Sequence, residues 1–457
     1  MRRVLMVSPH FPPDTSAGTH RVRLLAPHLP RYGWEPTVVT VDRRDYEGRL
    51  DPGLAELVPN SLRVVRCRAW SPRWTRKVGF GDLGLRALSG LYRTCVELLR
   101  RESFDVLFVT IYPAYPALLG PCLKRRFGIP VVLDYQDPWV GEWGKRVGGG
   151  PQGAPDWKSR VSRALAALLE AHVVRHADAL TAVSAATYEQ VRARYPNLRD
   201  TPCLELPIGG EPRDFEQARA HPRANPFFDP ADGAFHLCYV GTLLPMGLET
   251  LRALLRAVVL LRERQPAAYG RLRLHFFGTS NQTDPGAPAR VLPVARELGV
   301  AEAITETAAR IDYLSALTVL TDASGILLLG SSERHYTASK LYPALLAKRP
   351  ILAVYHEAST VSEVLRQTAR PSAARLVTYS DAQRAESRTE AICDALASLL
   401  SAAHDDPAGV EIARFATFSA ETLAGTLARL LDTVALGQSR HDTINHPTKP
   451  CDDCQHS

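Results

Sequence analysis

Short runs of β-branched and leucine residues alternate with longer segments of helical periodicity along most of the 457-residue chain. Helical patterns in the first half lie near residues 19–32, 82–101, 114–127 and 156–176. Six apolar runs predict strands between them, at residues 4–8, 37–41, 62–67, 106–110, 130–134 and 179–183. This alternation is typical of a parallel sheet that is covered by helices on both faces.

The pattern breaks at a polar, proline-rich stretch between residues 209 and 233 and then starts again. Further helices are expected near residues 247–264, 290–299, 312–321, 389–403 and 418–436, and strands at 236–242, 271–278, 325–330, 350–355 and 374–379. A chain of this length fits two domains of about 200 residues each. We therefore predict an α/β fold with two facing, doubly wound parallel sheets and a ligand-binding cleft at the carboxyl ends of their strands.

The repeated pattern sets the expected domain boundaries. The first domain spans residues 1–210, a linker 211–235, and the second domain 236–405. Residues 406–436 are expected to form C-terminal helices that pack back on the first domain, and residues 437–457 a polar tail.

The sequence predicts a cytoplasmic protein. It has no apolar run of about 18 residues that would cross a membrane. The start, MRRVLMVSPHF, resembles a signal peptide, but its apolar run stops at Ser8 and Pro9, so we interpret it as the first strand. Most of the eight cysteines lie in apolar segments, as reduced core thiols do. Cys451 and Cys454 have the spacing of a zinc or redox site, although an unstructured polar tail is the favoured interpretation.

Positive charge is concentrated in the first half, where residues 1–210 hold 30 Lys and Arg against 20 Asp and Glu. Such a surface is compatible with an anionic membrane as a partner, whereas no nucleic-acid partner is predicted. The helix expected at 82–101 has apolar residues on one face and arginines elsewhere. It is either a membrane-surface helix or a packed surface helix, and the second is favoured.

The loop after the first strand is the first candidate site. The chain has no P-loop, no G-x-G-x-x-G after its first strand and no G-x-S-x-G, which argues against the corresponding nucleotide and hydrolase sites. The segment SPHFPPDTSAGTHRVRLL places Gly18 at a tight turn and Thr19 at a helix start, with Arg21 in the first helical turn. Backbone amides and a guanidinium are thus expected to face the cleft and to bind a phosphate or a sugar hydroxyl.

Four stretches in order carry a resemblance to a known family. They are FPPDTSAGTHRVRLLAPHL with RYGWEPTVVT, FGIPVVLDYQDPW, HADALTAVSAATYEQVRARY with LPIGGEPRDF, and YTASKLYPALLAKRPILAV. Over about residues 1–380 the chain resembles the nucleotide-sugar-dependent glycosyltransferases of GT-B architecture, most closely the retaining family 4 type. The resemblance implies two Rossmann-like domains, the first for the acceptor and the second for the nucleotide diphosphate sugar.

The stretch SSERHYTASKLYPALLAKRP is the expected diphosphate site. The resemblance implies that Thr337 and Ser339 offer amides and hydroxyls to the diphosphate and that Lys340 neutralises the charge on the leaving group. Tyr336 or Tyr342 would pack against the bound sugar nucleotide. The alternative is structural, with Thr337 capping a helix and Lys340 solvated.

The sequence departs from the family at two places. An E-x7-E pair is usual in the family, but here its positions hold His335 and Pro343, so Glu333 is the nearest carboxylate that could replace it. Because proline is best tolerated in the first turn, the helix should start near Tyr342. In CYVGTLLPMGLETL the usual Arg and Lys are Thr242 and Met246, which leaves backbone amides of Gly241 and Thr242 to contact the diphosphate.

Asp137, in DYQDPW, lies where the family places an acidic residue facing the acceptor, and it could orient the hydroxyl or accept its proton. The alternative is that Asp137 caps the next segment and that Asp134 is buried and hydrogen bonded. We therefore expect a glycosyltransferase that uses a nucleotide diphosphate sugar and needs no metal and no further cofactor. Its acceptor would be a glycan, a lipid-linked saccharide or a small glycoside. Two alternatives stay open, a catalytically decayed binding protein and a nucleotide-sugar epimerase.

Overall fold

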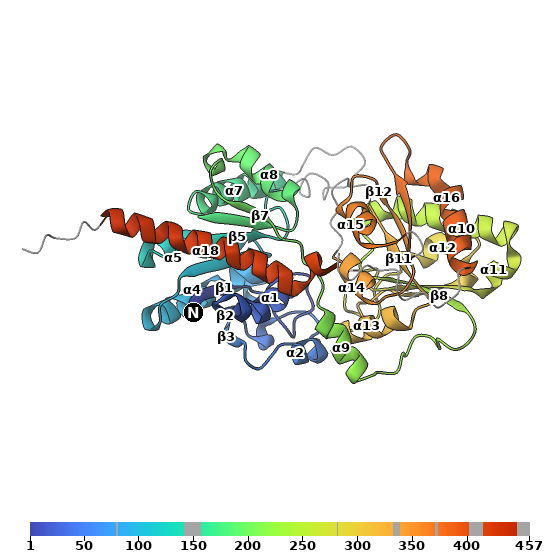
Figure 1. The fold of residues 1–457 in the computed structure, drawn as a ribbon, viewed down its shortest axis with the longest axis horizontal. Coiled ribbons are helices and arrows are strands. Elements are labelled where there is room, and N and C mark those ends of the chain that lie inside the picture. Colours follow the sequence, from blue (N-terminus) through green and yellow to red (C-terminus); the bar gives the residue numbers. More distant parts are fainter. Residues whose placement is uncertain are drawn as a thin grey trace, which may run out of the picture.

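The computed structural model describes residues 1–78, 81–140, 157–280, 282–331, 339–370, 373–401 and 415–445 and shows two α/β lobes side by side (Figure 1). The first lobe is built on a parallel sheet with the strand order β3-β2-β1-β4-β5-β6-β7. Its strands are β1 (Arg2–Val7), β2 (Trp34–Val41), β3 (Arg63–Cys67), β4 (Val106–Ile111), β5 (Val131–Tyr135), β6 (Ala179–Ala182) and β7 (Cys203–Glu205).

Helices cover both faces of this sheet. The helices of the first lobe are α1 (Thr19–Leu25), α2 (Pro52–Glu56), α3 (Pro72–Thr75), α4 (Leu83–Arg101), α5 (Leu119–Phe127), α7 (Trp157–Val174) and α8 (Ala185–Arg194). The layer that contains α4 buries its apolar residues with one face of the sheet, and α1 packs on the other face. The central strand β4 is an almost continuous apolar run because both of its faces are buried.

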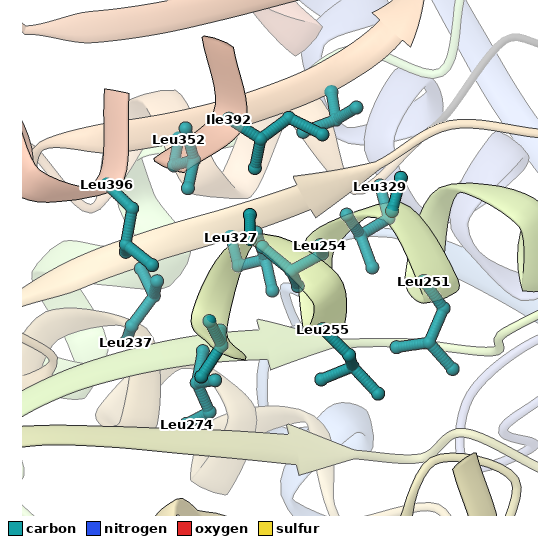
Figure 2. Packing of buried hydrophobic residues seen from close by; sticks show 14 of the residues in the cluster. Leu237, Leu251, Leu254, Leu255, Leu274, Leu327, Leu329, Leu352, Ile392 and Leu396 are labelled. Atoms are coloured by element: carbon teal, nitrogen blue, oxygen red, sulfur yellow. The ribbon is translucent and has the colours of Figure 1, made fainter. Parts of the chain in front are cut away.

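The second lobe repeats the plan with the strand order β10-β9-β8-β11-β12-β13. These strands are β8 (Phe235–Val240), β9 (Leu272–Phe277), β10 (Ile304–Thr307), β11 (Gly325–Leu329), β12 (Ile351–His356) and β13 (Ala374–Tyr379). Its helices are α10 (Leu248–Arg264), α11 (Pro266–Arg271), α12 (Leu292–Glu297), α13 (Tyr313–Asp322), α14 (Leu341–Leu346), α15 (Thr360–Thr368) and α16 (Thr389–Ser401). Figure 2 shows the main core of this lobe, where leucines of α10 and of the central strands interdigitate with Ile392 and Leu396 of α16.

Two segments connect the lobes. Helix α9 (Pro212–Ala220) follows β7, and the long helix α18 (Ala420–Asn445) returns across the first lobe (Figure 1). Leu423, Leu427 and Leu431 of α18 are buried against the side of the sheet that α1 covers. The two crossings meet at Gly210, whose amide donates to the Phe418 carbonyl at 3.0 Å and whose carbonyl accepts from Ala420 N at 2.8 Å.

The observed fold confirms the predicted fold class and adds elements that the sequence pattern did not indicate. Strands β7 and β10 lie at sheet edges and have three and four residues, too few for a clear apolar period. The linker contains α9, because Glu211 caps it and Pro212 occupies its first position. Helix α18 continues to Asn445, beyond the point where the polar tail was expected to begin.

Helix α4 settles the choice between a membrane-surface helix and a packed helix. Leu91, Cys95 and Leu98 are all buried in the core of the first lobe. The packed interpretation is confirmed, since the apolar face is occupied by the protein itself. In the described ranges, no helix combines the length and apolarity needed to cross a bilayer.

Candidate functional site

A cavity of about 640 Å³ lies between the lobes, at the carboxyl ends of strands from both sheets. His10 and Asp14 from the loop after β1 line it together with Tyr112, which follows β4. The second lobe contributes residues that follow β9 and β10, among them Thr283 and Arg310. The volume falls in the range of small-molecule sites, and the position is the one expected for ligands of open parallel sheets.

Asp14 organises the loop after β1. Its Oδ2 atom lies 2.7 Å from His10 Nδ1 and accepts hydrogen bonds from Ser16 Oγ at 2.5 Å and Thr19 Oγ1 at 3.1 Å. Burial alone would raise the pKa of Asp14, but the contacts with His10 and Ser16 bring it below its ordinary value. The carboxylate is therefore charged and holds the imidazole of His10 at the cavity wall.

Gly18 occupies the predicted turn for a steric reason. A Cβ atom at this position would lie 2.4 Å from Cδ1 of Tyr112, so only glycine allows the tyrosine ring to cover the loop. The ring of Tyr112 also packs against His10, with 5.6 Å between ring centroids. Gly18 thus shapes the cavity wall, and its contact with a bound sugar nucleotide stays a prediction.

Arg21 lies inside the fold and not on the cleft surface where its guanidinium was expected. Its side chain and that of Asp134 are both fully buried, with Nε of Arg21 3.0 Å from Oδ2 of Asp134. Arg21 Nη1 also donates to the Pro207 carbonyl at 3.0 Å. Burial lowers the pKa of Arg21 and raises that of Asp134, while their attraction opposes both shifts.

The reason for this placement is the environment at the carboxyl end of β5. A buried, hydrogen-bonded Asp134 was part of the alternative interpretation, and Asp134 indeed accepts a hydrogen bond from Thr181 Oγ1 at 2.7 Å. A carboxylate in this apolar layer needs a cation, and α1 supplies Arg21. The pair connects β5, α1 and the start of the interlobe connection.

Lys340 is a cation of the second lobe near its junction with the first. It precedes α14, and its Nζ donates to the Thr242 carbonyl and to Tyr239 Oη, each at 2.6 Å. The ammonium also lies 4.6 Å from the centroid of the Tyr239 ring. Burial lowers the pKa of Lys340 to about 7, so near neutral pH its charge is easily gained or lost.

Gly241 makes room for this lysine. Its φ of +131° is a conformation that side chains other than glycine rarely adopt, and a Cβ would lie 2.3 Å from Cε of Lys340. The loop after β8 and the segment before α14 are therefore in direct contact, and their binding of a diphosphate stays a prediction. In this structure Thr242 offers its carbonyl to Lys340.

Lys340 and Ser339 line a second cavity, which is smaller than the first and has a volume of about 180 Å³. Its walls come from both lobes and are mainly apolar, with His20 and Leu24 of α1 facing Leu317 of α13. Both cavities are thus bordered by the two lobes. Ser339 itself is exposed.

Asp137 follows β5 at the carboxyl edge of the first sheet. Its side chain reaches the surface, yet the surrounding protein excludes enough water to raise its pKa to about 6. Burial and then the negative charge of Asp137 raise the pKa of Tyr112, which places the carboxylate beside the ring that lines the large cavity. Asp137 and His10 are therefore both close enough to Tyr112 to influence it.

Some predicted site residues fall outside the described residues. These are Glu333, His335, Tyr336 and Thr337, and also Cys451 and Cys454 of the C-terminal segment. Helix α14 begins at Leu341, which confirms the expected start near Tyr342 and leaves Pro343 in the first turn. Within the described ranges, no three His, Cys, Asp or Glu side chains are grouped so as to hold a metal ion.

The sequence analysis missed several residues of the large cavity. His10 and Asp14 are four positions apart in the loop after the first strand, and this pairing of polar residues at a strand end was the available signal. Arg310 gave no signal, because its position depends on how the lobes face each other. Its guanidinium donates to the Thr15 carbonyl across the cleft.

Polar contacts fix the two lobes relative to each other. Arg23 of α1 forms a buried ion pair of 2.8 Å with Asp214 of α9, and Tyr313 Oη of α13 donates to the same carboxylate at 2.8 Å. The Tyr313 amide donates to Asp51 Oδ2 at 2.7 Å. These contacts hold the second lobe against the carboxyl edge of the first sheet.

Comparison with known proteins agrees with this architecture. Residues 17–209 match the family described as the glycosyl transferase 4-like domain. No curated protein matches the sequence. Among solved structures, a UDP-forming trehalose-phosphate synthase from Burkholderia xenovorans, in complex with glucose-6-phosphate, is 12% identical with a TM-score of 0.60. The alignment covers 94% of this chain and 100% of that one.

Two further structures have the same arrangement. A glycosyltransferase from Rickettsia africae is 12% identical with a TM-score of 0.55, covering 95% of this chain and 98% of that one. HepE from Anabaena, solved with UDP-glucose, is 13% identical with a TM-score of 0.51, covering 97% and 100%. The prediction of a GT-B fold is confirmed. The chain has a two-lobed GT-B fold, and residues 17–209 in its first lobe are similar to the glycosyl transferase 4-like domain.

Proposed function

We propose that the protein transfers a sugar from a nucleotide diphosphate sugar to a hydroxyl of a second substrate in the interlobe cleft. The observation that carries this proposal is the position of Lys340. It is a partly buried cation with a pKa near 7, held against the loop after β8 at the lobe junction. When a diphosphate leaves, its negative charge would replace the Thr242 carbonyl as the partner of Lys340. The negative charge would also keep the ammonium protonated.

In the proposed reaction the acceptor oxygen forms a bond to the anomeric carbon of the sugar. The bond between that carbon and the diphosphate oxygen breaks, and its electron pair remains on the diphosphate. Lys340 stabilises the growing negative charge. Asp137 or His10 orients the acceptor hydroxyl at the wall that the first lobe supplies.

We further propose that the sugar keeps its anomeric configuration and that no metal is required. Three carboxylates line the cavity, and each has a partner. Asp14 is engaged by His10, Glu47 forms an ion pair of 2.9 Å with Arg86, and Asp284 accepts a hydrogen bond from the Gly286 amide at 2.9 Å. The acceptor proton then passes to the departing diphosphate on the same face of the sugar. The resemblance to retaining family 4 enzymes supports this route, and chelation of divalent cations should leave the rate unchanged.

A thermal-shift panel of nucleoside diphosphates and their sugars tests the proposal, beginning with UDP-glucose because HepE was solved with it. The true sugar nucleotide should raise the melting temperature of the wild-type protein and have little effect on K340A. K348A serves as the matched control, because Lys348 is an exposed lysine at the end of the same helix.

Product analysis separates the three candidate functions. Sugar transfer that requires an acceptor supports the transferase. Conversion of the sugar nucleotide without any acceptor would indicate an epimerase, and nucleotide binding with no turnover over a broad acceptor panel would indicate a binding protein. Equal responses of wild type and K340A would contradict the role given to the lysine.

A further inference from the structure

Two tryptophans project from the first lobe into solvent. The exposed fractions are 65% for Trp70 and 72% for Trp74, the second of which lies in the short helix α3 between β3 and α4. Large aromatic side chains are normally buried. Neighbouring aromatic side chains that are this exposed often belong to an interaction surface. The segment has few apolar residues, so it shows no clear helical periodicity in the sequence.

The surroundings of the tryptophans are strongly basic. Residues 66–77 contain five Arg and Lys and no Asp or Glu. Asp45 pairs with Arg68, and Glu47 pairs with Arg76, so two of the five cations are compensated. The exposed side chains of Arg73 and Lys77 have no carboxylate partner among the described residues. Lys77 Nζ lies 5.1 Å from the centroid of the Trp74 ring.

The segment is anchored and presents its side chains in a fixed direction. The amide of Trp70 donates to the Arg86 carbonyl at 3.0 Å, and Arg86 Nη1 donates back to the Trp70 carbonyl at 2.8 Å. Helix α4 approaches so closely that a Cβ on Gly90 would lie 2.1 Å from the Arg68 carbonyl oxygen. A fixed surface loses little conformational entropy when it binds.

The same segment reaches the large cavity. Arg76, two residues after Trp74, lines the cavity, as do Leu83 and Arg86 of α4. A ligand that emerges from the cavity on this side therefore meets the basic and aromatic surface directly.

We propose that the Trp70–Lys77 surface docks on an anionic lipid membrane and places the acceptor end of the cleft at the bilayer, so that the acceptor is a lipid-linked alcohol or saccharide. Tryptophan is the side chain best suited to the boundary between head groups and acyl chains, and flanking Arg and Lys attract anionic head groups. The choice of a lipid-linked acceptor rests on the proposed transferase function. The docking itself does not.

Flotation of the full chain with vesicles tests the docking. Phosphatidylcholine vesicles that contain phosphatidylserine should bind the wild-type protein at low salt, and pure phosphatidylcholine vesicles should not. W70S/W74S should weaken binding by at least about tenfold, from the loss of apolar insertion. R73Q/K77Q should weaken it by about fivefold per charge. The control R219Q/R296Q removes two exposed arginines elsewhere and should bind as wild type does.

Two further measurements keep the docking and the transferase function separable. Nucleotide-induced thermal shifts should be identical in all these variants, because none changes the Lys340 region. With an acceptor embedded in vesicles, W70S/W74S should lose transfer while it keeps transfer to a detergent-dispersed acceptor. If nucleotides cause no thermal shift in the wild-type protein, the transferase function is overturned while the docking proposal is unaffected.

Some results would overturn the docking proposal. These are wild-type protein that stays unbound with anionic vesicles at low salt, and tryptophan variants that float as well as wild type. A third is fluorescence of Trp70 and Trp74 that responds to a single-stranded oligonucleotide but not to brominated lipid, since this would assign the surface to nucleic acid.

Discussion

The side chain of Lys340 packs directly against Gly241, so any side chain at position 241 would collide with the lysine. A Cβ on Gly241 would lie 2.3 Å from Cε of Lys340 and 3.0 Å from its Nζ. The two residues are 99 positions apart, yet the glycine decides where the ammonium can lie. The loop after β8 and the segment before α14 therefore depend on each other.

G241A should displace Lys340 and weaken nucleotide diphosphate binding about as much as K340A does. It should also destabilise the fold by about 1–3 kcal/mol, because alanine is strained at a φ of +131°. The control is G299A, where φ is also positive but no atom lies within 4 Å of the added Cβ. That variant should be destabilised and still bind nucleotide normally. Equal nucleotide affinity in G241A and wild type would contradict the steric coupling.

Lys340 should make nucleotide binding depend on pH near neutrality. Its pKa of about 7 lies below the ordinary value, so the free protein loses this charge as the pH rises through 7. A bound diphosphate favours the charged form, and affinity should therefore fall above pH 7 by up to about tenfold per pH unit. Calorimetric titrations with a nucleoside diphosphate between pH 6 and 9 measure this. K340A should show only the titration of the ligand, and K340R should lose the dependence because arginine stays charged.

Asp137 should set the acidic side of the activity profile. Burial raises its pKa to about 6, so the carboxylate that would orient the acceptor becomes protonated below that pH. The transfer rate of wild type should fall roughly tenfold per unit below pH 6. D137N should lower kcat by about a hundredfold or more and abolish this acidic limb. An unchanged limb in D137N would assign the titration to another group, and H10Q would then be measured in the same way.

Arg21 and Asp134 should behave as a coupled buried pair. Removing either partner leaves the other charge buried without compensation, so R21M or D134L should cost about 3–5 kcal/mol in the free energy of unfolding. The double variant R21M/D134L should recover much of that loss. Urea unfolding of the four proteins gives the coupling energy. Additive losses in the double variant would show that the two side chains act independently.

The two lobes were predictable from the sequence because their central strands are buried on both faces. The run at Gly325–Leu329 is apolar throughout, and the run at Val131–Tyr135 is apolar except for Asp134, which is a strong local signal. The short edge strands β7 and β10 each pair with only one other strand and mix polar with apolar side chains. Their sequence pattern therefore gives little evidence of a strand. Helix α9 was not predicted because most of its residues are polar and only Asp214 and Phe215 are buried, so it has no apolar face that the sequence would show.

The site could be predicted only as far as local sequence specifies it. The loops that hold Gly18, Gly241 and Lys340 were located by their motifs. The pairing of Arg21 with Asp134 was not, because the pattern of α1 does not show which polar residue turns inward. The sequence likewise could not reveal that Arg310 reaches the loop after β1, since that contact depends on how the lobes face each other.

Helix α18 should stabilise the first lobe although it follows the second in sequence. Leu427 has no exposed surface and belongs to the core cluster that includes residues of β1 and β2, so L427A should cost about 2–5 kcal/mol. L436A is the matched control on the same helix, because the Leu436 side chain is 53% exposed and its loss should change stability by less than about 0.5 kcal/mol. Hydrogen exchange can assign the loss to one lobe. In L427A the amides of β1 and β2 should exchange faster while those of β8 and β11 stay unchanged, and faster exchange confined to the second lobe would contradict this packing role.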